Sequence, residues 1–541
     1  GDGPGSLYWV LNNVNTRTDI SPDGEGLFVV TFAAGLDGQT ILVPSNRTLP
    51  PVVKPIRTNV ETVDGANPHV AVIAVSPAPG SPPSDGLVLA PGSDGSRISD
   101  LTFRAFVGAG LRLQSGQTVV TSNRFEDNTF GVLVESASNQ IGQGAATEDG
   151  PATTGNTFAG STIAGLQFNG AGATLNRVHG NHFLANQVGV SVFGGSGNWI
   201  GEVGAGNLIE SNALQGVSIG FGDQNTVLAN RFKGITAATP VQNSIVVSPG
   251  ANGGILPVQL LSASEAVGGI AVQVLSSAVA RPNAILSIYR LVGGEAVFYN
   301  NSAPTTLPEN EAVTVLVAPP PGGVPLTSSD RIIVTISTPP DASPVPPITT
   351  TAYDTSAFSN DALIRTRNIV VNTNDDGEGS LRDALLYVGS LPPDDEKRRI
   401  YFRIPDELKN FGDGWKIDVE SVLQLNTQAI VDGWDTTDLP RESLEPNVWI
   451  ASAGPVDGFY FNGPQSTLPG AAGSILRGLG FLDFTGTTIR VAADDVQLLG
   501  NRIFGKGADQ LNPPSNPSDQ VVVQGVGIDV VGVSGTVIGG L

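Results

Sequence analysis

A short phrase that occurs five times between Gly110 and Gly234 constrains the fold of this chain more than any other feature. Its first half is glycine followed by alternating apolar residues, and its second half is asparagine, any residue and an apolar residue. Alternation with period two indicates strands that bury one face, and glycine and asparagine tolerate the positive φ of sharp corners. The first halves begin at Gly110, Gly131, Gly165, Gly189 and Gly216. The second halves are Asn123-Arg124-Phe125, Asn156-Thr157-Phe158, Asn181-His182-Phe183, Asn207-Leu208-Ile209 and Asn230-Arg231-Phe232.

Recurrence of a phrase every two to three dozen residues is typical of a solenoid. Short strands at this period predict a parallel β-helix in which each coil stacks on the one before. We expect Asn123, Asn156, Asn181, Asn207 and Asn230 to stack as one ladder of hydrogen-bonded amides. The apolar residue two places after each asparagine should then point into the core. The alternative is five unrelated hairpins of a β-sandwich.

Composition narrows the classes of partner. The chain has 541 residues, a net charge of −22, no cysteine and no methionine. The negative charge argues against nucleic acid and anionic membranes as partners, and no run of 18 apolar residues predicts a membrane span. The lack of cysteine fits an exported protein. The lack of methionine leads us to expect a chain that has been cut from a longer one.

Two stretches far apart share a helical pattern. Leu7, Val10, Leu11 and Val14 have the spacing 0, 3, 4, 7, and Leu381, Ala384, Leu385 and Val388 repeat it. Ser380 and Asp383 have the spacing of a capping box. We therefore expect helices over residues 6–14 and 380–388, each covering the open end of a β-helix. Later segments correspond as well, among them residues 63–65 with 431–433 and Asn123-Arg124-Phe125 with Asn501-Arg502-Ile503.

The pattern changes between these two blocks. Strand-like runs are separated there by proline and glycine turns, which favours an immunoglobulin-like sandwich. The runs are Pro257–Leu261, Gly269–Leu275, Ala284–Arg290, Ala312–Val317, Arg331–Ser337 and Thr349–Tyr353. The predicted domains are a β-helix over 1–250, the sandwich over 251–362 and a second, partial β-helix over 363–541.

One segment resembles a known family. The residues from Asn368 to Ala384, NIVVNTNDDGEGSLRDA, are similar to the opening motif of the CSLREA-type right-handed β-helix surface proteins. The asparagine coils also match, and residues 351–359 resemble the closing strand of the family's Ig-like modules. The resemblance implies right-handed β-helices in large, secreted, repeat-built surface proteins of bacteria or archaea, without an agreed enzyme activity. The first block departs from the motif, since Tyr8-Trp9 replaces its Arg-Asp pair.

Candidate catalytic residues are few. His179 and His182 flank Asn181 at a corner of the repeat, where other coils carry Leu-Ala-Asn-Arg or Thr-Ser-Asn-Arg, so we expect a structural role. His69 stands alone. Residues 372–375, Asn-Thr-Asn-Asp, resemble one polygalacturonase motif but lie in the opening strand. No coil gathers two carboxylates with a basic residue, and the chain is predicted not to be an enzyme.

Other residue groups leave alternatives open. Aspartate-rich turns occur at Asp375/Asp376/Glu378, Asp394/Asp395/Glu396 and Glu309/Glu311. Their spacing does not match a calcium loop, so solvated turns are favoured, no cofactor is predicted, and Ca²⁺ is the alternative. Residues 46–48 and 300–302 are glycosylation sequons. We expect Trp415, Trp434 and Trp449 to be exposed. They form either a sugar-binding face or, as we favour, a cover for the first coils of the second β-helix.

The function predicted from these features is structural: a rigid extracellular rod at a prokaryotic cell surface, as a filament subunit or a stalk segment. The alternatives are a carbohydrate-binding adhesin and a polysaccharide lyase or epimerase. The expected partner is another copy of the chain, joined head to tail by donation of the last strand, with polysaccharide as a second partner. The residues assigned to this contact are Val530, Val531, Val533, Val537, Ile538 and Leu541. The alternative to assembly is a segment of one continuous giant chain.

Overall fold

The structure is a computed structural model. It describes residues 3–18, 23–36, 38–44, 47–61, 70–74, 85–147, 150–234, 241–266, 268–328, 330–339, 352–391, 398–434, 446–464, 470–504 and 526–539. Within these ranges the chain is all-β apart from two α-helices, α1 (Leu7–Thr16) and α2 (Leu381–Ser390), and a few 3₁₀ turns. None of the helices in the described ranges has the length and apolarity that a membrane crossing requires.

The chain forms two compact units. Unit 1 comprises Gly1–Gln259, Leu275–Glu311 and Arg331–Asp361, and unit 2 comprises Leu260–Val274, Ala312–Asp330 and Ala362–Leu541. Strands of the segment 251–362 therefore belong to both units. The Ig-like sandwich and the three domain boundaries stay predictions.

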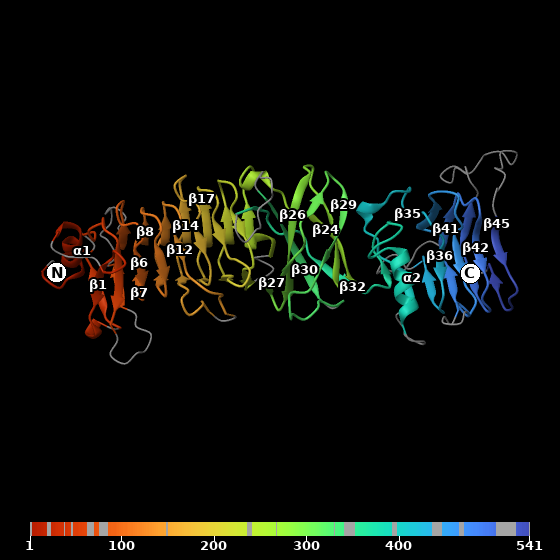
Figure 1. The fold of residues 1–541 in the computed structure, drawn as a ribbon, viewed down its shortest axis with the longest axis horizontal. Coiled ribbons are helices and arrows are strands. Elements are labelled where there is room, and N and C mark those ends of the chain that lie inside the picture. The colour runs from red at the N-terminus through yellow and green to blue at the C-terminus, as the bar shows by residue number, and fades with distance from the viewer. Residues whose placement is uncertain are drawn as a thin grey trace. The chain divides into compact units, whose positions relative to one another are not determined.

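Unit 1 contains three parallel sheets, whose stacked strands can be followed in Figure 1. Sheet 1 consists of β1 (Phe28–Phe32), β3 (Ile56–Val60), β6 (Arg97–Ser99), β9 (Val119–Thr121), β12 (Gln140–Ile141), β15 (Arg177–Val178), β18 (Trp199–Ile200) and β21 (Thr226–Val227). Sheet 2 contains β2 (Thr40–Val43), β4 (Val70–Ala74), β7 (Leu101–Arg104), β10 (Arg124–Glu126), β13 (Thr157–Ala159), β16 (His182–Leu184), β19 (Leu208–Glu210) and β22 (Arg231–Lys233). Sheet 3 consists of β5 (Leu87–Leu89), β8 (Ala109–Leu113), β11 (Phe130–Val134), β14 (Ala164–Asn169), β17 (Val188–Phe193), β20 (Gln215–Ile219) and β23 (Ile245–Val247).

The strand order shows that the coils form a parallel β-helix. The chain passes from β9 in sheet 1 to β10 in sheet 2 and β11 in sheet 3, and then returns to sheet 1 as β12. From β6 onward each strand of these sheets pairs in parallel with the strand three places later. One turn of the helix therefore uses three strands, one more than the two halves of the repeated phrase.

The glycines of the phrase have a different role from the one expected. Gly131 and Gly189 lie inside β11 and β17, and neither adopts a positive φ. A Cβ on Gly131 would lie 2.4 Å from the carbonyl oxygen of Gly165 on the next coil, and one on Gly189 would lie 2.5 Å from that of Gly216. The expectation of corner glycines chosen for positive φ is wrong, because close approach between coil backbones excludes a side chain at these positions.

Unit 1 also contains antiparallel strands. These are β26 (Arg281–Val292), β27 (Glu295–Asn301), β28 (Thr305–Leu307), β30 (Arg331–Thr338) and β31 (Asp354–Thr355). The run predicted at Thr349–Tyr353 lies partly outside the described residues, and the strand there begins later, at Asp354. β27 pairs antiparallel with β22 of the last coil, which protects an edge that the parallel stack leaves open.

Unit 2 repeats the three-sheet arrangement. Its first sheet consists of β33 (Ile369–Val370), β34 (Arg399–Phe402), β37 (Ile430–Asp432), β40 (Ile475–Arg477), β43 (Gln497–Leu499) and β46 (Val537–Ile538). The second contains β35 (Trp415–Val419), β38 (Val448–Ser452), β41 (Leu479–Leu482) and β44 (Arg502–Phe504). The third contains β36 (Leu423–Leu425), β39 (Phe459–Phe461), β42 (Thr487–Val491) and β45 (Val526–Val530). β24 (Gln259–Ala266), β25 (Gly269–Leu275), β29 (Ala312–Val317) and β32 (Ala362–Arg365) complete the described strands of this part of the chain.

Both predicted helices lie against the core of their units. In α1, which Figure 1 shows beside β1, Leu11 and Val14 are buried, whereas Leu7 and Val10 are half-buried against the same core. In α2 the four apolar residues are all buried, and the helix packs on β33, β34 and β36. They are Leu381, Ala384, Leu385 and Val388.

A serine caps each helix, and for α2 the sequence spacing predicts it. Ser6 Oγ accepts from the Trp9 N–H at 3.2 Å, and Ser380 Oγ accepts from the Asp383 N–H at 3.1 Å. The reciprocal half of the predicted capping box differs, because the Asp383 carboxylate accepts from the N–H of Gly379 and pairs with Arg367. The helix start is therefore held by both a cap and an ion pair.

Leu385→Ala should lower the free energy of unfolding of unit 2 by about 2–5 kcal/mol, because it leaves a cavity under α2. Leu386→Ala is the matched control, since Leu386 is 66% exposed on the same helix and should change stability by about 0.5 kcal/mol or less. Urea unfolding of both variants measures the difference. Equal midpoints would show that the helix covers nothing.

Candidate functional site

The five asparagines of the repeated phrase lie in one row at the corner between sheets 1 and 2. In this first ladder Nδ2 of each asparagine donates to Oδ1 of the asparagine on the next coil, at 3.1, 2.9, 3.1 and 2.8 Å. The same Oδ1 atoms accept from the preceding asparagine's backbone N–H at 2.9–3.1 Å. The ladder consists of Asn123, Asn156, Asn181, Asn207 and Asn230. Since all are buried, the row satisfies polar groups that water cannot reach.

Each rung also bonds in the opposite direction. Nδ2 of Asn156 donates to the carbonyl of Val120, and Nδ2 of Asn181 donates to that of Ile141, both at 2.8 Å. Each amide thus connects its own coil with the coil on either side. The corner asparagines do not adopt a positive φ. The expectation that these asparagines occupy the corner because they tolerate a positive φ is wrong. They stabilise the corner through the hydrogen bonds of their side-chain amides.

A second ladder, which the sequence analysis missed, follows the corner between sheets 3 and 1. Nδ2-to-Oδ1 bonds join its first four members at 2.8, 2.9 and 2.9 Å. The fifth accepts the N–H of Asn225 and donates to the carbonyl of Thr355 in β31. The members are Asn139, Asn176, Asn198, Asn225 and Asn252. Four of them begin the same Asn-x-apolar phrase, so the sequence signal was present.

The third corner, between sheets 2 and 3, carries a broken row. Asn186 Nδ2 donates to Asn212 Oδ1 at 3.1 Å, but Ser161 occupies the equivalent position one coil earlier. Asn128 stands on the coil before that, and its Nδ2 donates to the carbonyl of Phe103. A serine side chain is too short to continue the row.

Aromatic rings stack inside the first ladder. The ring centroids of Phe103, Phe125, Phe158 and Phe183 are separated by 5.3, 4.9 and 4.6 Å, with interplanar angles of 7°, 13° and 10°. Ile209 and Phe232 follow in the same row and are also buried. Coil register thus places one apolar residue of each phrase directly over the next.

The histidines of the repeat lie at the corner predicted for them. His182 is in β16, with Nε2 2.9 Å from Oε2 of Glu210 on β19. His179 precedes Asn181, and burial lowers the pKa of its imidazole. Both therefore lie within the coil packing. His69 lies outside the described residues.

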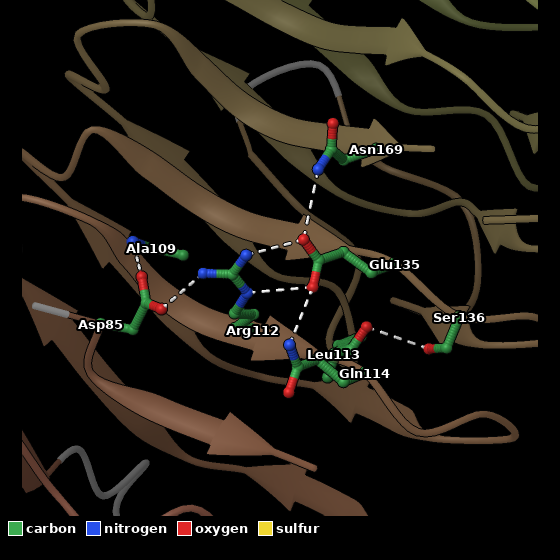
Figure 2. Close-up of polar contacts among 8 residues, drawn as sticks. All are labelled: Asp85, Ala109, Arg112, Leu113, Gln114, Glu135, Ser136 and Asn169. Carbon is green, nitrogen blue, oxygen red and sulfur yellow. Dashed lines mark hydrogen bonds and ion pairs between the residues drawn. The ribbon is translucent and has the colours of Figure 1, made fainter. Parts of the chain in front are cut away.

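The outer face of sheet 3 carries a connected polar cluster (Figure 2). Arg112 on β8 binds Glu135 through two nitrogens at 2.7 and 3.0 Å, and it binds Asp85 at 2.9 Å. Glu135 also accepts from Gln114 at 3.1 Å and from Asn169 on β14 at 3.2 Å. The Arg112 guanidinium, which donates to Glu135, holds the pKa of that carboxyl below its usual value. The side chains are therefore fixed in place. Two carboxylates and a basic residue meet here from successive coils, a grouping that the sequence did not predict.

The acidic turns are engaged in local contacts. Asp375 pairs with Arg382 on α2 at 2.6 Å, and Asp376 accepts the N–H of Gly377 at 2.8 Å. Residues 394–396 lie outside the described part of the chain. Among the described residues no three or more His, Cys, Asp or Glu side chains gather in a way that could hold a metal ion. Of the two sequons, Asn46 is outside the described residues and Asn300 lies in β27.

The three tryptophans do not form one exposed face. Trp415 is buried in β35, with its indole N–H bonded to the carbonyl of Pro405 at 2.9 Å, so its expected exposure is wrong. The Trp449 ring lies over Gly480 of the next coil, and the Trp434 ring lies over Gly478 and Gly500. Within unit 2 the indoles of Trp434 and Trp449 therefore cover glycine backbones of the following coils.

The residues assigned to head-to-tail contact lie on the last described coil of unit 2. Val530, Val531, Val537 and Ile538 are exposed, whereas Val533 is half-buried against the core of the unit. Leu541 lies outside the described residues. These exposed side chains lie on two consecutive strands of different sheets and in the connection between them, where they form apolar surface on this coil.

No protein-family model matches the sequence, and no curated protein matches it. Of the solved structures, the full-length tailspike protein 2 of Escherichia coli O157:H7 bacteriophage CAB120 is similar at 9% sequence identity and a TM-score of 0.22. The likeness covers 61% of this chain and 59% of the tailspike chain, so this chain spans less than two thirds of that protein. A likeness at this level carries no inference, and the β-helix is established by strand pairing alone.

Asn181→Ala should lower the free energy of unfolding by about 2–4 kcal/mol, because it strands the buried N–H and amide of Asn156 and the carbonyl of Ile141. Gln187→Ala, at an exposed position on the same coil, is the control and should change it by about 0.5 kcal/mol or less. Denaturant unfolding measures both. A harmless Asn181→Ala would mean that the ladder does not stabilise the coils.

The Arg112–Glu135 contact predicts a dependence on pH. Because the pKa of Glu135 is lower in the folded protein, its contribution is complete above the ordinary glutamate pKa and is lost as the pH falls through the folded value. Glu135→Gln should therefore destabilise the protein at pH 7 by about 1 kcal/mol or less and have no effect near pH 2. Thermal unfolding across this range, with the exposed Glu61→Gln as control, tests it. A penalty that did not shrink on acidification would contradict the assignment.

Proposed function

We propose that this chain is a structural segment of a secreted protein at a prokaryotic cell surface, built as a rod of stacked coils. The observation that carries the proposal is the first ladder, in which each amide from Asn123 to Asn207 is bonded to the coil before it and the coil after it. Coils that contact only their neighbours make a one-dimensional object, whose stiffness depends on bonds along the stack. The similarity of residues 368–384 to the CSLREA-type opening motif supports the same role.

The phenylalanine stack supports rigidity further. Rings 4.6–5.3 Å apart with nearly parallel planes leave no space for one coil to slide over another. The net charge of −22 keeps such a surface soluble and separates neighbouring rods laterally. Tight packing between successive coils, together with electrostatic repulsion between neighbouring rods, suits a stalk or a thin filament.

Head-to-tail association is the second part of the proposal. The last described coil of unit 2 exposes apolar side chains on β45, on β46 and between them, and these fit the addition of a further strand. A contact of this kind uses different surfaces on its two sides, so it does not close and produces a filament. Further coils of one continuous chain are the alternative occupant of the same surface.

A carbohydrate-binding adhesin is the second candidate function. It is favoured by the outer face of sheet 3, where amide, carboxylate and guanidinium groups are held in fixed positions (Figure 2). A polysaccharide lyase or epimerase is the third candidate, and assays on uronate polymers with and without calcium test it directly.

Electron microscopy of the purified chain tests the structural proposal. We expect rods that lengthen as protein concentration rises, and Val537→Asp/Ile538→Asp should abolish lengthening because charges would be buried in the contact. Val324→Asp, at an 81% exposed position of unit 2, is the control and should assemble normally. Deletion of residues 532–541 should also prevent assembly.

Unchanged filaments from Val537→Asp/Ile538→Asp and from the deletion would exclude association through the last coil. Compact particles from the unaltered chain would exclude the rod itself. Circular dichroism of each variant shows whether lost assembly reflects lost folding.

A further inference from the structure

The outer face of sheet 3 differs in composition from that of sheet 2. Strand register aligns one outward-facing residue of each coil in a single row, which consists of Arg112, Leu133, Gln167, Ser191 and Ser218. A second row runs beside it. In that row Glu135 is hydrogen-bonded to Gln114 and Asn169, and Asn169 is aligned with Phe193 of the next coil. By contrast, the outer face of sheet 2 carries Arg124, His182, Glu210, Arg231 and Lys233. Beyond the Arg112 cluster, the later coils of this face present amide and hydroxyl groups, namely those of Gln167, Asn169, Ser191 and Ser218.

This polar row ends in a pair of exposed aromatic rings. Phe193 is 58% exposed and Phe221 is 60% exposed, so neither side chain is part of the hydrophobic core. Their centroids are 5.6 Å apart and their planes meet at 88°, so the rings form an angled apolar shelf. Two large apolar side chains paired in water carry a cost in hydration that a ligand would remove.

The backbone beside the shelf is held firmly. The Gly220 N–H donates to the carbonyl of Val192 at 2.8 Å. A Cβ at Gly222 would lie only 1.8 Å from the Gly195 carbonyl, so the turn after Phe221 packs directly on the preceding coil. A Cβ at Gly220 would lie 3.4 Å from the Val192 carbonyl oxygen, so this residue also packs on the preceding coil. The shelf is therefore preorganised for a ligand.

We propose that this face binds a neutral glycan, with sugar rings on the shelf formed by Phe193 and Phe221 and hydroxyl groups on Asn169 and Glu135. The apolar face of a sugar ring stacks on aromatic carbon, and its rim of hydroxyls needs planar donors and acceptors. Carboxylate and amide groups supply these at fixed positions, since Asn169 already donates to Glu135. Parallel strands lie about 4.8 Å apart, so successive coils present these groups as a regular series to an extended polymer.

Charge selects the class of glycan. Arg112 is bound between Asp85 and Glu135, so the cluster has two carboxylates for one guanidinium. The whole chain carries −22. Uronic-acid polymers would be repelled by this face, whereas neutral polysaccharides would not be.

Affinity electrophoresis tests the proposal with the full chain, in native gels containing laminarin, galactomannan or hydroxyethylcellulose, and in a gel containing polygalacturonate. We expect at least one neutral polymer to retard the protein and polygalacturonate not to. The double variant Phe193→Ala/Phe221→Ala should raise the dissociation constant, as derived from the retardation, by about tenfold or more. Asn169→Ala should raise it by a smaller factor. Phe193→Tyr keeps the ring and should still bind.

Val203→Ala is the matched control, because Val203 is an exposed apolar residue in the connection between β18 and β19. Absence of retardation by every neutral polymer would overturn the proposal, and so would equal retardation of the double alanine variant and the unaltered chain. Self-association that disappears in the double variant, seen by sedimentation without sugar, would assign the shelf to a protein contact instead. The proposal gives the carbohydrate-binding candidate a site, and its failure would leave rod formation, which electron microscopy reports separately, unaffected.

Discussion

The side-chain amide at a coil corner is the interaction on which the rest of unit 1 depends. A chain that turns sharply inside a close-packed stack leaves peptide N–H and C=O groups that neither strand pairing nor water satisfies. Asparagine solves this because its amide has the same donor and acceptor as a peptide group and is short enough to remain at the corner. Bonds at 2.8–3.1 Å along the first ladder show that each coil supplies what its neighbour lacks.

The last coil of the stack must satisfy the same groups without a further coil, and it does so through the antiparallel strands of unit 1. Phe232 lies on the last coil, so no phenylalanine of a following coil stacks on it. Its ring instead makes an edge-on contact with Phe358, with the ring centroids 5.5 Å apart. Arg231 on the same strand binds Glu295 of β27 at 2.7 Å. Asn252 ends the second ladder by donating to a carbonyl of β31. Within unit 1 the antiparallel strands thus take the place of a further coil.

The repeated phrase was enough to predict the β-helix and the first ladder, because a period tells which residues share a position. It did not tell which atoms those residues contact. The phrase therefore predicts a corner with positive φ at Gly131. In the structure the backbone of the next coil lies so close to Gly131 that it leaves no room for a side chain. The second ladder was not predicted, although Asn176 and Asn198 begin the same Asn-x-apolar phrase with valine or isoleucine as its apolar residue. Phe193 follows the inward Val192, so alternation alone would have placed it outside. Its pairing with Phe221 depends on contacts between coils that no local pattern records.

The first ladder has a further consequence, since all of its amides point the same way. Each Oδ1 from Asn156 to Asn230 accepts from the preceding coil. Each Nδ2 from Asn123 to Asn207 donates one N–H to the Oδ1 of the following coil and the other to a carbonyl of the preceding coil. Aligned amide dipoles add, as peptide dipoles do along an α-helix, so the row has a positive end at its later coils and a negative end at its earlier ones. A stack added front to back continues this dipole, and a stack added front to front opposes it. The buried amides therefore give the stack a direction that its surface charge does not show.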